Sequence, residues 1–188
     1  MPEHVPSPGE AYSHGIHRMR MPHLEFVYRI VCQMTVNYTT IAAVPDTNIS
    51  RLVLPIAGGT VSGPDIKGII VPNSGADWAQ VIGDELKQFT RLDARYTLET
   101  NDGHYILVNA KGVFQQGSNA LSRVNTDPTV TQDDAEYFTH LSFESSSTGP
   151  YGWMNSIVAI GVMTMFEDQP IIDCYRLTNF PGIDLGQL

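Results

Sequence analysis

Residues 92–114 read LDARYTLETNDGHYILVNAKGVF, and this stretch decides the fold. Between residues 92 and 100 the side chains alternate. One set packs (Leu92, Ala94, Tyr96, Leu98, Thr100), and the other is polar (Asp93, Arg95, Thr97, Glu99). A period of two is typical of a β-strand with one buried face. The sequence NDG at 101–103 then indicates a tight turn, and residues 104–114 form the return strand. The stretch therefore predicts an antiparallel hairpin.

Similar segments recur along the chain. We expect further strands over residues 23–36, 51–56, 60–63, 65–72, 76–82, 138–144, 154–165 and 171–177. Short strands with turns every eight to twelve residues indicate a sandwich or a barrel. We favour an all-β fold, a single antiparallel β-barrel of about eight to ten strands, because the polar faces of several strands carry bulky groups that suit either solvent or a polar cavity. A short helix or helical turn is expected at 84–90 or 118–124.

The chain of 188 residues fits one domain better than two. Residues 1–22 are rich in Pro, Gly and His and lack apolar periodicity, so we interpret them as an N-terminal arm, followed by a barrel domain over 23–188. Residues 115–136 are polar and non-periodic. A loop of this length in a small domain is usually functional or disordered, and we interpret it as a lid or partner-contact loop, with a plain surface loop as the alternative.

Charge excludes several classes of protein. The chain has 11 Lys and Arg against 20 Asp and Glu, and only 16 % of its residues are charged. No Lys/Arg cluster suits the displacement of phosphate counterions, so we expect no nucleic-acid partner. With 42 % hydrophobic residues the chain is not a disordered one. The apolar run 157–165 is too short for a bilayer core of about 30 Å, and no signal peptide is recognisable, so we expect a cytoplasmic protein without a membrane partner.

Neither a metal nor a cofactor is expected. Cys32 and Cys174 lie far apart, and no Cys/His pairs have the spacing of a zinc site. Two buried thiols are favoured over a disulfide between them. Phosphate-binding loops, a GxGxxG fingerprint and a GxSxG elbow are missing from the sequence.

Two short segments are candidates for a small-molecule site. If residues 149–155 are extended, Tyr151, Trp153 and Asn155 share one face and would provide flat apolar walls with one orienting amide. Core packing with a satisfied amide is the alternative. Asp77 and Trp78 would provide a base beside an aromatic wall. The alternative is an Asx turn at Asp77 followed by a Trp78 that packs in the core.

Three further groups are candidates for proton transfer or charge recognition. Arg95 shares a strand face with Asp93 and would bind a carboxylate; an ordinary salt bridge is the alternative. Glu144, at a strand end, is a candidate general acid or base, or else a rim charge. His140 is the one histidine placed mid-strand, and Asn109 of the return strand is included among the substrate-binding candidates.

An ordered series of blocks resembles domain-of-unknown-function family 3237. The blocks are 24–26 (LEF), 55–60 (PIAGGT), 63–64 (GP), Gly68, 75–78 (GADW), 92–98 (LDARYTL), 100–103 (TNDG), 137–138 (YF), 143–144 (FE) and 151–155 (YGWMN). The resemblance covers about residues 24–176. It implies a calycin-like barrel of bacteria and fungi, in which some fungal relatives serve secondary metabolism as cofactor-free cyclases, isomerases or dehydratases. It also implies that the pocket or its rim is formed by Asp77, Trp78, Arg95, Tyr96, Glu144, Tyr151, Trp153 and Asn155. The sequence departs from the family pattern in its arm and in the 115–136 insertion.

The leading functional hypothesis is a cofactor-independent enzyme of natural-product biosynthesis. It binds a hydrophobic, oxygenated small molecule in the barrel and promotes cyclisation or cycloaddition (Diels-Alderase-like), isomerisation or dehydration. Holding the reactant in a reactive shape can lower a barrier by about 7–11 kcal/mol. The predicted catalytic residues are Arg95, Glu144, Asp77 and His140, and the predicted substrate-binding residues are Trp78, Tyr96, Tyr151, Trp153, Asn155 and Asn109. The alternatives are a non-catalytic carrier barrel and an oligomeric interaction protein, for example a homodimer.

Overall fold

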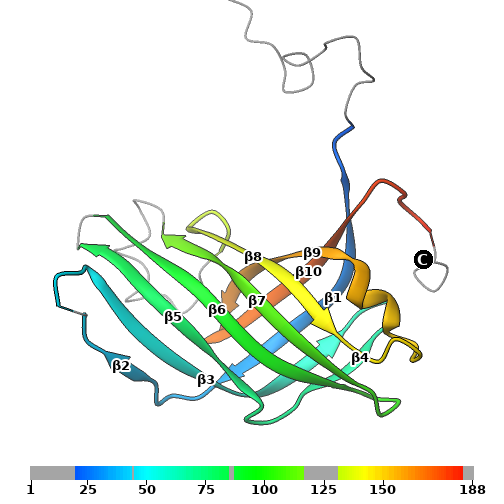
Figure 1. Ribbon diagram of the computed structural model, residues 1–188, viewed down its shortest axis with the longest axis horizontal. Helices are drawn as coiled ribbons and strands as arrows, with labels where there is room; N and C mark the ends of the chain where they lie inside the picture. Colours follow the sequence, from blue (N-terminus) through cyan, green and yellow to red (C-terminus); the bar gives the residue numbers. More distant parts are fainter. Residues whose placement is uncertain (1–19, 44, 85–86, 117–130, 184–188) are drawn as a thin grey trace, which may run out of the picture.

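The hairpin of residues 92–114 belongs to strands β6 (Lys87–Thr100) and β7 (Tyr105–Gln116) of the computed structural model (Figure 1). Its register pairs Leu92 with Gly112 and Glu99 with Tyr105. Gly103 in the connecting turn has φ of 84°, a conformation that glycine adopts without steric cost. The hairpin prediction is confirmed.

The structure describes residues 20–43, 45–84, 87–116 and 131–183. In these ranges lie the strands β1 (His23–Met34), β2 (Thr39–Ile41), β3 (Ile49–Ser62), β4 (Lys67–Ile70), β5 (Gly75–Asp84), β6, β7, β8 (Ala135–Glu144), β9 (Val158–Phe166) and β10 (Gln169–Thr178), and the 3-10 helix η1 (Gly152–Ser156).

The strands close into an antiparallel barrel. From β5 through β10 each strand pairs with the next, β10 pairs with β1, β1 with β3, and β3 with β5, which completes a ring of eight. The short strands β2 and β4 are additional: β2 pairs with the first half of β3, and β4 bridges β3 and β6. The predicted all-β barrel is confirmed.

Three local expectations are corrected. The helical turn at 84–90 is wrong, because β5 continues to Asp84 and β6 begins at Lys87. The extended segment 149–155 is also wrong, since residues 152–155 belong to η1. The glycines at 58–59 do not separate two strands: β3 is continuous, and a Cβ on Gly59 would lie 2.3 Å from the carbonyl oxygen of Val31, so glycine is needed for β1 to approach. Most of the expected arm (1–19) and of the polar insertion (117–130), with its helix at 118–124, lies outside the described residues.

One end of the barrel is filled by side chains. Tyr28, Leu98, Ile106 and Met154 are fully buried there, and Tyr151, at the start of η1, donates a hydrogen bond to Asp102 in the β6–β7 turn. Arg176 points inward at this end and is 2 % exposed. It donates to Glu25 (Nε–Oε2 2.8 Å), and Glu25 also accepts a hydrogen bond from the backbone N–H of Gly182. A buried charge is tolerated only when it is paired in this way. We call this the closed end.

Cys32 and Cys174 are buried free thiols, as the sequence indicated. Burial raises the pKa of both to about 12, so they are poor nucleophiles at neutral pH. Among the described residues, no helix has the length and apolar character needed to cross a membrane.

Candidate functional site

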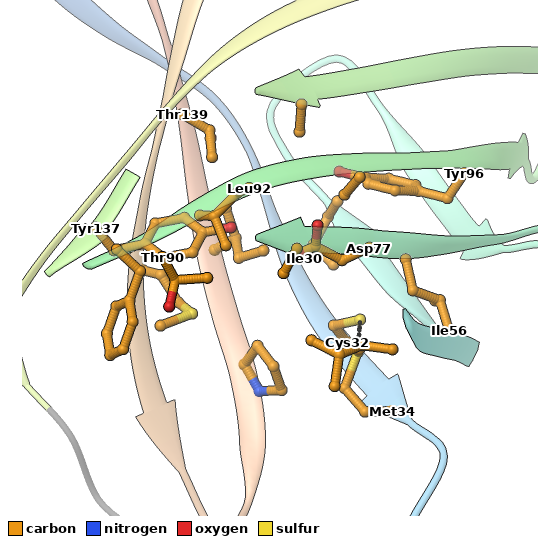
Figure 2. Close-up of a pocket in the computed structure, with 18 of the residues that line it drawn as sticks. Ile30, Cys32, Met34, Ile56, Asp77, Thr90, Leu92, Tyr96, Tyr137 and Thr139 are labelled. Carbon is orange, nitrogen blue, oxygen red and sulfur yellow. Dashed lines mark hydrogen bonds between the residues drawn. The ribbon is translucent and has the colours of Figure 1, made fainter. Parts of the chain in front are cut away.

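The other half of the barrel interior is a cavity of about 450 Å³. Its wall is largely aliphatic, because the inward-facing positions of β1, β3 and β6 carry residues such as Ile30, Leu54 and Leu92. Four sulfur atoms add to the lining, from Cys32, Met34, Met163 and Met165. Figure 2 shows these walls converging on one space. A cavity of this size and polarity suits an apolar small molecule.

The cavity extends to the end of the barrel opposite the closed end. Met34 ends β1, Leu52 lies near the start of β3, and Phe114 near the end of β7, and all three line it. Asp168 and Pro170, from the β9–β10 turn and the start of β10, lie at the same end. We call this end the mouth.

Asp77 is the carboxylate within this apolar wall. It is half-buried on β5 and pairs with Leu54 of β3 and Ala94 of β6, and all three side chains face the cavity. Its Oδ1 accepts a hydrogen bond from the backbone N–H of Asp93 at 2.9 Å. Burial raises the pKa of Asp77 from 3.8 to about 6; the nearby charge of Asp93 also raises it, and the hydrogen bond opposes the shift. This carboxyl can therefore gain and lose a proton near neutral pH.

Three hydroxyl groups accompany Asp77. Tyr96 and Tyr137 line the cavity, and burial raises the pKa of both phenols well above the ordinary value, so each is a neutral hydrogen-bond donor. The charge of Asp77 contributes to the raised pKa of Tyr137, so the two groups lie within electrostatic reach of each other. Thr139 Oγ1 is buried in the wall and makes no hydrogen bond within the described part of the chain. These groups can bind an oxygen atom of a ligand.

The sequence-predicted residues divide into three groups. Asp77 and Tyr96 line the cavity (Figure 2). Five others alternate with cavity-facing residues and so lie on the outer face of the wall: Arg95, His140, Glu144, Trp78 and Asn109. The outer side chains include Trp78, which is 38 % exposed, and Arg95, whose side chain is 55 % exposed.

The third group lies at the closed end, away from the cavity. Tyr151 donates from its hydroxyl to Asp102 (2.9 Å) and so ties η1 to the β6–β7 turn. Asn155 exchanges two hydrogen bonds with the backbone of Ser145, at 2.8 and 3.0 Å. Trp153 packs against the core. These contacts fix η1 over the end of the barrel, in agreement with the packing alternative that the sequence left open.

Tyr137 and Thr139 were missed as site residues. The signal lay in β8, where Tyr137, Thr139, Leu141 and Phe143 alternate with charged and polar residues. Phe138 obscured this pattern, because it adds a large aromatic ring, 53 % exposed, to the outer set. In the described part of the chain, no three His, Cys, Asp or Glu side chains are arranged to hold a metal ion.

The comparisons with known proteins agree with this architecture. The model of the family described as "protein of unknown function (DUF3237)" matches residues 22–177. The chain belongs to this family. The resemblance seen in the sequence is thereby confirmed. A curated relative, the UPF0311 protein of Rhodopseudomonas palustris (strain TIE-1), is 28 % identical over 156 residues, which cover 83 % of this chain and 98 % of the relative.

Solved structures share the barrel of this DUF3237 chain. A β-barrel-like protein of Acinetobacter baumannii superimposes with a TM-score of 0.71 at 28 % identity, covering 87 % of this chain and all of that one. A second structure, described as an enzyme from Penicillium herquei, has a TM-score of 0.58 at 19 % identity and covers 86 % of this chain and 98 % of its own. At that identity the likeness shows the fold alone, so the chemistry has to be argued from the cavity.

Proposed function

We propose that the barrel binds an apolar, oxygenated small molecule and catalyses a redox-neutral proton transfer within it, either an isomerisation or an intramolecular cyclisation, with Asp77 as the group that takes and returns the proton. The observation that carries this proposal is a carboxylate placed inside an apolar cavity beside neutral hydroxyl donors. A carboxyl that titrates near pH 6 is suited to both halves of such a reaction.

In the isomerisation, the Asp77 carboxylate removes a proton from the carbon next to a substrate carbonyl. The electron pair of that C–H bond moves into the carbonyl, and the resulting enolate oxygen accepts a hydrogen bond from a wall hydroxyl such as that of Tyr137. The Asp77 carboxylic acid then returns the proton to a more distant carbon of the conjugated system. The double bond has moved, and no electrons have been gained or lost.

In the cyclisation, a substrate hydroxyl gives its proton to Asp77 while its oxygen bonds to the far carbon of a conjugated enone. The enolate carbon then takes that proton back from Asp77. A cycloaddition needs no proton carrier, so Asp77 favours the proton-transfer reactions among those that the sequence suggested.

Further features support an enzyme of this kind. The lining is large and apolar enough for a natural product, and the Penicillium herquei neighbour, which shares the fold, is described as an enzyme. We extend the proposal to secondary metabolism and to a cytoplasmic location, where two free thiols such as Cys32 and Cys174 are expected to stay reduced.

The test is deuterium exchange in D₂O with a panel of lipophilic enones and hydroxy-enones. Each compound is recovered after incubation with the protein and analysed by mass spectrometry for isomerised or cyclised product and for deuterium on carbon. We expect turnover by the wild type and a loss of at least about 100-fold in Asp77→Asn, the usual contribution of a general base.

The matched control is Asp168→Asn, which removes the acidic side chain at the mouth and should retain turnover. A compound that binds tightly but is recovered unchanged and free of deuterium would favour the carrier alternative. Turnover that survives Asp77→Asn would remove Asp77 from the mechanism.

A further inference from the structure

The wall between β5 and β6 is interrupted next to Asp77. Backbone pairing joins Asp77 to Ala94 and Gln80 to Arg91, but the two positions between them are unpaired. At the first of these positions, side chains bind the backbone groups of Asp93 and Trp78. Asp77 accepts a hydrogen bond from the N–H of Asp93 on the inner side, and Arg51 donates to the carbonyl oxygen of Trp78 on the outer side (3.2 Å). The interruption lies opposite a hollow of about 340 Å³ on the outer face.

This outer hollow gathers positive charge. Arg51, Arg91 and Lys111 line it, and Arg95 lies 3.9 Å from Asp93 at its edge. These are four of the eleven Lys and Arg residues in a chain whose net charge is −9. They come from β3, β6 and β7, so the barrel, and not a basic stretch of sequence, brings them together. Such a concentration of cations attracts an anion.

The one acidic side chain in the hollow leaves the cations available. Arg95 Nε and Lys111 Nζ both lie 3.9 Å from Asp93 Oδ1, which is within reach of an ion pair but too far for a hydrogen bond. Asp93 Oδ1 is buried and has no hydrogen-bond partner among the described residues. Arg51 uses one donor on Trp78 and keeps further N–H groups.

The hollow also has an apolar surface. Trp78, a residue that is 38 % exposed, lines it next to Leu92, whose side chain lines the inner cavity on the other side of the wall. A flat group can lie on the indole while an anionic group meets the guanidinium and ammonium groups.

We propose that this outer hollow is a binding site for a small molecule in which a carboxylate or phosphate is attached to a flat apolar group. The anionic oxygens bind Arg91 and Lys111, and the flat part lies on Trp78. The site is separate from the cavity and does not depend on catalysis there. In this proposal Arg95, which lies away from the cavity, contributes a neighbouring positive charge that attracts the anion.

The experiment uses the full chain labelled with ¹⁵N at low, constant ionic strength. The chain has two Trp residues, so its spectrum has two indole N–H signals, which Trp153→Phe assigns. Phenyl phosphate and benzoate are titrated separately, with benzyl alcohol as the uncharged counterpart. We expect the Trp78 signal to move and saturate with one or both anions, while the Trp153 signal at the closed end stays in place. The tighter anion identifies the preferred head group.

Matched variants locate the site. Arg91→Gln and Lys111→Gln should each weaken the binding about fivefold, the size of one exposed charge contact. Lys67→Gln removes an exposed charge of β4 outside the hollow and should change nothing. Asp93→Asn removes the competing carboxylate and should tighten binding. The proposal is overturned if the Trp78 signal does not saturate, if benzyl alcohol binds equally well, or if Arg91→Gln and Lys111→Gln bind like the wild type.

Discussion

The position of Asp77 is energetically unfavourable for its charged form. Its carboxyl lies in an apolar cavity, where the charged form loses hydration, and within the described ranges the hydrogen bond from the N–H of Asp93 is the compensation that the structure shows. A side chain kept at such a cost is typical of functional sites. The cost itself can be measured without any knowledge of the substrate.

Asp77→Asn should stabilise the protein more at pH 8 than at pH 5. The folded-state pKa, about 6, exceeds the unfolded value near 3.8, so the folded state binds the proton more tightly. The stability that this proton contributes is present below about pH 4 and is lost as pH rises through 6. We expect the stability difference between Asn and Asp to grow by about 1 kcal/mol from pH 5 to pH 8.

Urea unfolding of both proteins at the two pH values measures this difference. Asp168→Asn, the same substitution on an exposed side chain, is the matched control. An equal effect of Asp77→Asn at pH 5 and pH 8 would mean that Asp77 is not perturbed in the folded state.

At the scale of elements, the strands control the cavity through close backbone approach. β5 begins at Gly75, where an added Cβ would lie 1.7 Å from the carbonyl oxygen of Arg95 on β6. Two residues later the same strand presents Asp77 to the cavity. Gly75 therefore allows the close approach of β5 to β6, and this approach fixes the position of Asp77.

Gly75→Ala should destabilise the barrel by about 2–4 kcal/mol, because backbone atoms cannot move aside as a flexible side chain can. The comparison is Gly103→Ala in the β6–β7 turn, where nothing lies within 4 Å and the cost comes only from the positive φ of 84°. That cost is about 1 kcal/mol. Thermal and urea unfolding of both variants give the comparison; a Gly75→Ala protein as stable as Gly103→Ala would contradict the tight contact.

At the scale of the whole molecule, the barrel divides into a packed half and a hollow half. The closed end contains fully buried side chains such as Tyr28, Leu98 and Met154, whose packing supplies stability, together with the Glu25–Arg176 pair. The mouth half leaves about 450 Å³ unfilled, which removes packing that the fold would otherwise gain. The division predicts that the cavity can be filled without loss of the fold.

Ala94→Leu should reduce ligand uptake and leave the protein folded. Ala94 is a small residue of the cavity wall between Leu92 and Tyr96, so the larger side chain occupies ligand space. The affinity for a lipophilic enone, measured by equilibrium dialysis, should fall at least about tenfold. The unfolding temperature should stay equal or rise. Val113→Leu, on the outer face of β7, is the control and should bind normally. Normal uptake by Ala94→Leu would show that ligands bind elsewhere.

The sequence by itself determined most of the strands, the β6–β7 hairpin and the barrel class, because alternation and turn chemistry are local properties. It also singled out Asp77 and Tyr96. It did not determine which face of each strand points inward, and so Arg95, His140 and Glu144 were expected beside the ligand although they lie outside. The sequence also predicted an extended segment over residues 149–155. In the structure, hydrogen bonds of Asn155 with Ser145 and of Tyr151 with Asp102 hold η1 over the closed end. Only the tertiary structure decided these points. The inner face of a barrel exists once distant strands such as β1 and β10 have paired, and the position of the cavity depends on which end the remaining side chains fill.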